Sequence, residues 1–409
     1  MYSLKHLARA AAVGSVLAVV ACEASRDVFG PNPPLGGEIF RRYVAIGNSL
    51  TAGWQSGGIN DSLQQQAYPL LLAIQMGTPY KYASLVNPGC PPPINDFQTQ
   101  TRVGTGSTGT TCLTRSASSV TDVLNNVGVP EARVLDPVSA STVASNALTT
   151  FILGGKTQVQ RALDARPTFA TIWIGANDVL QAAYTGILTP TPNVSNGIVS
   201  SQTEFQASYD LMIKQLLDSM PNLKGVLIGV PQASSIPLLS SGALIAASPA
   251  VQLGIAAVAG KPVAVDPNCV GSSALITTPL LLNLIRANAI VPLITCEPGV
   301  DPTDPRVGNL FVLDPAERAT LTAVINGYNA YIQSKADAIG FAYWDPNPTL
   351  AGLPPTQKAP FPSFAPTNTF GTAFSLDGVH PSAEGQKLIA NNLIAVINAK
   401  YGTTLQAIP

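Results

Sequence analysis

Three side chains of the types used in nucleophilic catalysis stand out in this sequence: Ser49, Asp377 and His380. The chain has 2 histidines, and the other one, His6, lies in a stretch that has the features of a cleaved leader. Imidazole chemistry in the mature protein therefore depends on His380. Asp377 precedes it by three residues, a spacing that in a turn brings a carboxylate to one ring nitrogen and leaves the other free. A neutral imidazole oriented by a carboxylate can activate a serine hydroxyl.

Ser49 follows a short apolar run at residues 43–46 and the turn residues Gly47 and Asn48. An apolar run without polar alternation predicts a strand that is buried on both faces. Open α/β sheets bind ligands at the carboxyl ends of such strands. The pattern therefore places the Ser49 hydroxyl at that edge of a sheet. Taken alone, it also fits a strand-to-helix turn in which Ser49 is only the helix cap.

Two further turn residues follow predicted strands in the same way. Asn177 comes just after the apolar run 168–174, and Gly89 comes just after residues 80–86. When a serine attacks a carbonyl, an oxyanion forms that needs hydrogen-bond donors. The Asn177 amide and the backbone N–H groups of Ser49 and Gly89 could supply them. Taken alone, Asn177 also fits an Asx turn or a helix cap, and Gly89 fits a plain turn glycine.

These segments resemble, in chain order, the four blocks of the SGNH (GDSL-like) hydrolases: Gly47-Asn48-Ser49-Leu50, Gly89, Gly175-Ala176-Asn177-Asp178 and Asp377-Gly378-Val379-His380. The resemblance implies a serine hydrolase of carboxylic esters in which Ser49 is the nucleophile, His380 the base and Asp377 its orienting residue. It also implies an oxyanion hole formed by Ser49, Gly89 and Asn177, with no metal and no organic cofactor. Asn48 stands where the family usually has Asp, and the surroundings of Gly89 are less typical.

The rest of the chain alternates between strand and helix patterns. Strands are predicted at residues 43–46, 80–86, 168–174, 225–230 and 341–344, and the clearest helices at 62–76, 157–165, 204–220, 315–339 and 383–398. Such alternation predicts an α/β fold with a parallel sheet between two layers of helices. We therefore expect a three-layer α/β/α hydrolase domain at residues 39–409, with a five-stranded, flavodoxin-like sheet.

Residues 231–306 interrupt this alternation with an apolar segment that has few charges, and residues 243–259 are almost all Ala, Leu, Ile, Val and Gly. We expect an insertion that carries its own short helices. Two interpretations stay open. The insertion is either a lid beside the active site or a helical pair within the core of the domain.

The N-terminus has the features of a targeting segment. A positively charged start leads into an apolar run at residues 10–21, too short for an ordinary transmembrane helix and typical of a signal peptide over residues 1–21. The run ends at Cys22 and resembles a bacterial lipobox, in which the cysteine is lipidated and becomes the mature N-terminus. An ordinary signal peptide with an incidental cysteine is the alternative. Residues 22–38 are expected to be a tether, and Glu23 after the cysteine favours an outer-membrane lipoprotein.

Four cysteines remain after Cys22, and an even number in an exported chain indicates disulfides. Three connectivities are possible. We favour the pairs Cys90–Cys112 and Cys269–Cys296, because each pair brackets a loop rich in Gly, Ser or Pro. A zinc site is not expected, since no Cys-x-x-Cys spacing occurs.

The composition narrows the function classes. The net charge of -1 gives no electrostatic reason to expect a nucleic-acid partner. The apolar insertion favours an esterase or lipase whose substrate has an apolar acyl chain, with the membrane contacted through the N-terminal lipid. A carbohydrate O-deacetylase is the alternative, although 3 Trp and 6% aromatic residues give little material for a sugar-binding platform. A non-catalytic surface binding lipoprotein is the second alternative, and the intact set of Ser49, Asn177, Asp377 and His380 disfavours it.

Overall fold

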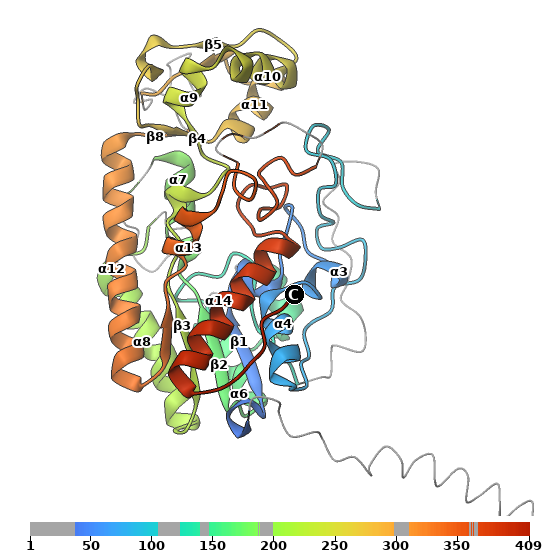
Figure 1. Ribbon diagram of the computed structural model, residues 1–409, viewed down its shortest axis with the longest axis vertical. Helices are drawn as coiled ribbons and strands as arrows, with labels where there is room; N and C mark the ends of the chain where they lie inside the picture. Colours follow the sequence, from blue (N-terminus) through green and yellow to red (C-terminus); the bar gives the residue numbers. More distant parts are fainter. Residues whose placement is uncertain are drawn as a thin grey trace, which may run out of the picture.

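The computed structural model describes residues 37–104, 123–139, 147–186, 188, 199–297, 311–359, 361, 363 and 367–409. At its centre lies a parallel sheet with the strand order β1-β2-β3-β9, formed by β1 (Tyr43–Gly47), β2 (Phe169–Trp173), β3 (Lys224–Ile228) and β9 (Ala342–Trp344) (Figure 1). Every residue of β1 and of β2 is buried, as expected of a parallel sheet that is covered on both faces. The fold is the α/β class that the sequence predicts.

Helices cover both faces of this sheet (Figure 1). Strand side chains alternate between the faces, so Tyr43 and Ala45 of β1 belong to one apolar core while Val44 and Ile46 belong to the other. The first core contains α4 (Tyr68–Met76) and α14 (Ala383–Tyr401). The second contains α6 (Gln158–Asp164), α8 (Gln202–Ser219) and α12 (Pro315–Ile339). This is the predicted three-layer arrangement.

The long helices begin where the sequence supplies capping residues. In α8 the Ser201 side chain accepts the N–H of Glu204, and the Glu204 side chain accepts the N–H of Ser201. In α12 the same reciprocal bonds join Asp314 and Glu317. Such boxes satisfy two backbone donors that a helix start would otherwise leave unpaired. Local sequence therefore defines where α8 and α12 begin.

The predicted strand at residues 80–86 does not form, and the sheet has four strands instead of five. The edge of β1 is lined instead by residues 125–127, where Asn126 makes single parallel bridges to Ala45 and Tyr82. Within residues 80–86, the side chain of Gln64 binds the N–H of Leu85 and a nearby carbonyl. Side chains thus take up backbone groups that a strand ladder would need.

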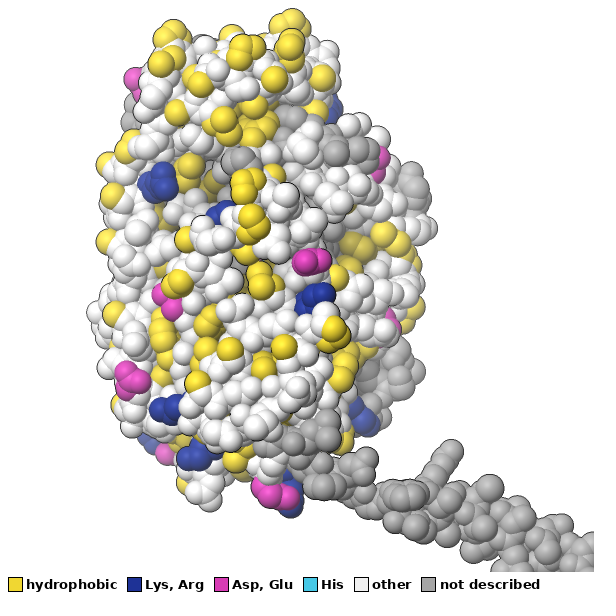
Figure 2. Space-filling model, in the orientation of Figure 1, with side chains coloured by type: hydrophobic (Ala, Val, Ile, Leu, Met, Phe, Trp, Pro, Cys, Tyr) yellow, Lys and Arg dark blue, Asp and Glu magenta, His cyan; other side chains and the backbone are white. Residues whose placement is uncertain are grey.

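Between β3 and α12 the chain forms a group of short elements at the carboxyl end of the strands, here called the cap (residues 240–297; Figure 1), whose buried residues continue the second apolar core. Its elements are β4 (Ser240–Ser241), α9 (Gly242–Ala247), α10 (Pro249–Ala259), β5 (Ala264–Val265), β6 (Leu275–Ile276), α11 (Thr278–Arg286) and β7 (Leu293–Ile294). The strand β8 (Val312–Leu313) pairs with β6 and joins the cap to α12. The face shown in Figure 2 carries many apolar and few charged side chains on the cap.

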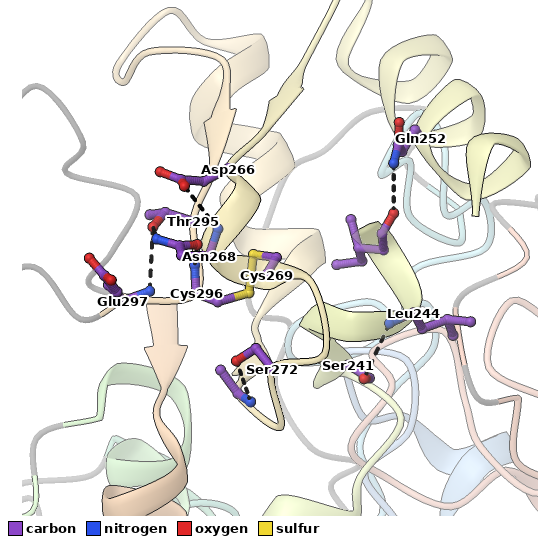
Figure 3. The surroundings of a disulfide bond; sticks show 12 residues. Ser241, Leu244, Gln252, Asp266, Asn268, Cys269, Ser272, Thr295, Cys296 and Glu297 are labelled. Carbon is purple, nitrogen blue, oxygen red and sulfur yellow. Dashed lines mark hydrogen bonds between the residues drawn. A yellow bond between two sulfur atoms is a disulfide. The ribbon is translucent and has the colours of Figure 1, made fainter. Parts of the chain in front are cut away.

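A disulfide between Cys269 and Cys296 fastens two segments of the cap, as the sequence led us to expect (Figure 3). The Asn268 side chain adds hydrogen bonds to the Cys296 N–H and to Thr295. A Cβ atom at Gly242 would lie 2.2 Å from the Cys296 sulfur, so only glycine lets α9 approach the disulfide this closely.

Of the other predicted cysteine pair, the structure describes one member. Cys90 is buried and disulfide-bonded. Cys112 lies outside the described residues, so its pairing with Cys90 stays a prediction. The signal peptide, Cys22 and most of the tether lie in residues 1–36, which are also outside the described part. Among the described residues, no helix combines the length and apolar character needed to cross a bilayer.

Candidate active site

The nucleophile turn is built by the residues at the end of β1. Asn48 caps α2 (Ser49–Ala52), since its side chain accepts the Leu50 N–H. A Cβ atom at Gly47 would lie 2.2 Å from Thr51 Oγ1 and 2.5 Å from the Trp173 carbonyl oxygen, so this turn requires glycine. The chain therefore passes from strand to helix within one residue, and Ser49 begins the helix at the carboxyl edge of the sheet.

The structure brings Ser49, Asp377 and His380 together. His380 Nε2 lies 2.8 Å from Ser49 Oγ, and His380 Nδ1 lies 2.8 Å from Asp377 Oδ2. Because a carboxylate only accepts hydrogen bonds, the ring proton belongs on Nδ1 and Nε2 accepts the serine hydroxyl. The arrangement is a serine, a general base and an orienting carboxylate in series.

Asp377 is held in its ionised form. Burial alone would raise its pKa, but the charge of His380 and hydrogen bonds from His380 and Val379 outweigh burial and lower the pKa to about 2. The carboxylate is therefore available to orient the imidazole throughout the ordinary pH range. It can also stabilise the imidazolium that forms when Ser49 gives up its proton.

Two groups in the described residues are candidate donors to an oxyanion. Ser49 is the first residue of α2, where a helix leaves the N–H without an intrahelical acceptor, and no backbone acceptor for it occurs among the described residues. Asn177 lies in the turn η3 (Ala176–Asp178), and its Nδ2 donates to the Ala132 carbonyl at 2.9 Å. A carboxamide nitrogen has two hydrogens, so one is left for an oxyanion.

No contact among the described residues joins Gly89 directly to this group, so its role as an oxyanion donor stays a prediction. A Cβ there would lie 2.6 Å from the Ile59 carbonyl oxygen, and Ile59 and Cys90 share a small apolar cluster with Ala52 of α2. The segment that Asn177 contacts is the loop 126–132. That loop also lies beside the nucleophile turn, because the Val129 N–H donates to the Gly47 carbonyl.

Sequence reasoning missed the loop 126–132 because it followed the glycine after residues 80–86, which do not form a strand. The available signal was Gly128, which lies between Val127 and Val129. In the structure this glycine packs against Thr51 of α2. Within the loop, Glu131 has a positive φ of 66°.

A family model described as GDSL-like Lipase/Acylhydrolase matches residues 43–393. The chain belongs to this family. Its members cleave carboxylic esters, so the protein is a carboxylic ester hydrolase. No curated protein matches the chain.

Solved structures of similar fold have low sequence identity to this GDSL-like hydrolase. An extracellular lipase from Streptomyces rimosus shows 15% identity and a TM-score of 0.33, covering 88% of this chain and 98% of that one. Phospholipase A1 from Streptomyces albidoflavus NA297 shows 14% identity and a TM-score of 0.35, covering 88% and 98%. The acetylxylan esterase Axe2 from Geobacillus stearothermophilus shows 11% identity and a TM-score of 0.36, covering 87% and 94%. At identities this low, the substrates of these enzymes do not indicate the substrate of this chain.

In this GDSL-like hydrolase, Asp178 fastens the turn that carries Asn177. Its buried carboxylate accepts the Val134 N–H at 2.9 Å and the hydroxyl of Ser200. Burial raises the pKa of Asp178 to about 6, against the opposing effect of these two hydrogen bonds. Asp178 thus joins the Asn177 turn to two neighbouring segments, a positioning role that the sequence pattern did not reveal.

An apolar cavity of about 100 Å³ is lined by chain neighbours of Ser49 and His380 in this GDSL-like hydrolase, but not by those two residues themselves. Leu50, next to the nucleophile, lines it, as do Val379 and Pro381 on either side of His380. The rest of its wall comes mainly from the ends of the central strands and from α13 (Asn347–Gly352) and α14. The ring centroids of Trp54 and His380 lie 6.2 Å apart. Within the described residues, no group of three His, Cys, Asp or Glu side chains is placed to hold a metal ion.

Proposed function

We propose that this protein is an exported serine esterase that hydrolyses esters of short apolar acids through an acyl-enzyme on Ser49. The observation that carries the proposal is the hydrogen-bonded series from Ser49 through His380 to Asp377. The membership of the chain in a family of ester hydrolases supports the reaction type. Export is supported only by the signal-peptide features at residues 1–21.

The geometry supports a two-step mechanism. Ser49 Oγ attacks the ester carbonyl while its proton passes to His380 Nε2, and the Ser49 N–H and Asn177 Nδ2 stabilise the oxyanion. Collapse of the tetrahedral intermediate releases the alcohol, which takes the proton from His380. A water molecule then attacks the acyl-enzyme, with His380 again accepting a proton, and Ser49 leaves with that proton. Asp377 holds the ring throughout and stays ionised.

The cavity lined by chain neighbours of the catalytic residues supports a preference for short apolar acyl groups. An engineered cavity of roughly 150 Å³ with an apolar lining holds benzene in another protein. The cavity here measures about 100 Å³, so it suits an acyl tail of only a few carbons. The same small volume also suits an acetyl group, which keeps a carbohydrate O-deacetylase as the second candidate.

An activity profile separates these candidates. The purified protein would be assayed with p-nitrophenyl acetate, butyrate, octanoate and laurate and with acetylated xylo-oligosaccharides, and Ser49→Ala would serve as the inactive control. We expect the highest kcat/KM on butyrate or acetate. A strong preference for the acetylated sugars would establish the deacetylase instead. No turnover of any substrate, with intact folding, would favour the binding protein.

A further inference from the structure

The loop that carries the catalytic acid is fastened to the segment that follows the nucleophile helix. We call residues 375–380 the acid loop and residues 54–58 the strap. The Ser56 N–H donates to Ser375 Oγ at 2.8 Å, and the Leu376 N–H donates to Ser56 Oγ at 3.1 Å. The Gly57 N–H donates to Asp377 Oδ2 at 2.8 Å. Three hydrogen bonds thus join the strap to the acid loop.

The strap is a tight hairpin turn. Gln55 and Gly58 exchange backbone hydrogen bonds of 2.9 and 3.1 Å, and the two residues between them have positive φ angles, 54° at Ser56 and 64° at Gly57. Positive φ at both central residues is the signature of a type I′ turn. At its start, the Trp54 N–H donates to the Ser49 carbonyl at 3.0 Å. The strap is therefore a short, defined link from the nucleophile to the acid loop.

Ser375 is where this link meets the catalytic carboxylate. The residue is 6% exposed, and its hydroxyl lies 3.1 Å from Asp377 Oδ1. Since its oxygen already accepts the Ser56 N–H and a carboxylate only accepts, the hydroxyl hydrogen must point at Oδ1. The same Oδ1 accepts the N–H groups of Val379 and His380, while Oδ2 faces the imidazole. Ser375 therefore adds a side-chain donor to the three backbone N–H groups that hold the Asp377 carboxylate, on the oxygen that does not face the ring.

We propose that Ser375 is a positioning residue for the hydrolysis: its hydroxyl fixes the Asp377 carboxylate so that Oδ2 meets His380 Nδ1, and its oxygen couples that carboxylate through the strap to Ser49. The inference rests on the proposed serine-esterase function. Without the hydroxyl, the carboxylate keeps its backbone donors but gains freedom to rotate, and the imidazole follows it. Ester binding does not use this contact, so the loss falls on the chemical step.

The test compares Ser375→Ala and Ser375→Thr with the wild-type chain. The matched control is Ser84→Ala, because Ser84 also donates to a carboxylate, Asp61 Oδ1 at 2.6 Å, in a segment outside the catalytic group. Measured quantities are kcat and KM for p-nitrophenyl acetate, Tm, and the downfield proton resonance of His380 Nδ1–H, identified by its absence in His380→Ala. We expect Ser375→Ala to lower kcat on the order of tenfold with KM unchanged, the scale of one hydrogen bond to a charged group. It should also shift the resonance, and Ser375→Thr should restore both.

The proposal is overturned if Ser375→Ala keeps the wild-type kcat and resonance. It is equally overturned if Ser84→Ala lowers kcat as much, or if Ser375→Thr folds but restores neither readout, because the effect would then be one of general stability. Should Ser375→Ala fail to fold, Ser375→Thr with a wild-type resonance still supports the role, and a shifted one overturns it. A wild-type chain without esterase activity would refute the proposed function, while the resonance would still test the positioning of the ring.

Discussion

At the scale of single residues, the site depends on hydrogen bonds whose direction is fixed by chemistry. Asp377 can only accept, so it determines which nitrogen of His380 carries the proton and which receives the Ser49 hydroxyl. Asn177 gives one amide hydrogen to the Ala132 carbonyl, and we propose that the other serves the reaction. Replacing one of these side chains should therefore lower turnover more than it lowers the stability of the fold.

Asn177→Ala removes an oxyanion donor. Loss of such a donor typically lowers turnover by about a hundred- to a thousandfold. We expect this loss in kcat on p-nitrophenyl acetate, with a small change in Tm, because among the described residues the side chain makes one hydrogen bond, to the Ala132 carbonyl. Near-normal turnover with a much lower Tm would show that Asn177 only shapes its turn.

Asp377 links the site to the pH dependence of stability. Its folded pKa of about 2 lies below the reference value of 3.8, so its ionised form stabilises the folded state above pH 3.8 and this stabilisation is lost as the pH falls toward 2. The difference corresponds to about 2 kcal/mol. We expect the free energy of unfolding of the wild type to exceed that of Asp377→Asn near pH 6, with the gap narrowing between pH 4 and 2. A gap independent of pH would contradict this.

At the scale of elements, the segment that leads into the cap is attached directly to the acid loop. The Leu238 N–H, just before the cap, donates to the Gly378 carbonyl at 3.0 Å, and Thr277 in the cap donates to the Tyr184 carbonyl of α7 (Leu180–Thr185). A cap whose entry segment is joined to the acid loop fits the lid, one of the two interpretations that the sequence left open. That role stays a proposal.

The cap disulfide provides a test of how independent this unit is. Replacing Cys269 and Cys296 by serine removes a link across a sequence separation of 27, worth about 2–4 kcal/mol in typical proteins. We expect faster amide hydrogen exchange in α9, α10 and α11 and unchanged exchange in β1 to β3. Uniform destabilisation of the central strands would show that the cap and the sheet form one cooperative unit.

Leu350 of α13 tests the cavity as the acyl site. Leu350→Trp should narrow the cavity and lower kcat/KM for butyrate and octanoate esters by about tenfold relative to acetate, because the longer tails lose their space. The matched control is Leu211→Trp on α8, where the leucine is 43% exposed and away from the cavity. An unchanged chain-length profile in Leu350→Trp would remove the cavity from the account of specificity.

The elements that the sequence predicts well are those whose signals are local. The apolar runs predicted as strands at β1, β2 and β3 and the helix patterns at α8 and α12 coincide with the observed elements. The segment 80–86 has strand-like composition, but its backbone partners are side chains of distant residues such as Gln64. Pairing of that kind is a tertiary property. The same failure left the loop 126–132 without a prediction.

The catalytic residues can be predicted from the sequence, but the residues that position them cannot. Ser49, Asp377 and His380 are found from their residue types and from the turn spacing that links Asp377 to His380. Ser375 and Asp178 are not, because a serine or aspartate is common in any turn, and their roles follow only from which segments the fold places beside them. A contact such as the Ser56 N–H to Ser375 Oγ bond, which spans 319 residues, leaves no spacing pattern in the chain.

At the scale of the whole molecule, the N-terminal lipid anchor is open to a direct test. Cys22→Ser should leave an unlipidated precursor that no longer fractionates with membranes, since the lipobox cysteine would be the attachment point. The wild-type chain expressed in parallel is the control. Retention of the variant on membranes through detergent-free washing would refute the lipobox interpretation.

The chain enters the described fold through η1 (Glu38–Phe40), at the amino ends of the strands, while Ser49 and Asn177 lie at the carboxyl ends (Figure 1). If Cys22 carries a lipid, residues 22–36 reach at most about 50 Å from the bilayer. The attachment point would then lie at the end of the strands opposite to Ser49 and Asn177. An anchor at that end leaves the carboxyl edge of the sheet free to meet esters that arrive from the surroundings.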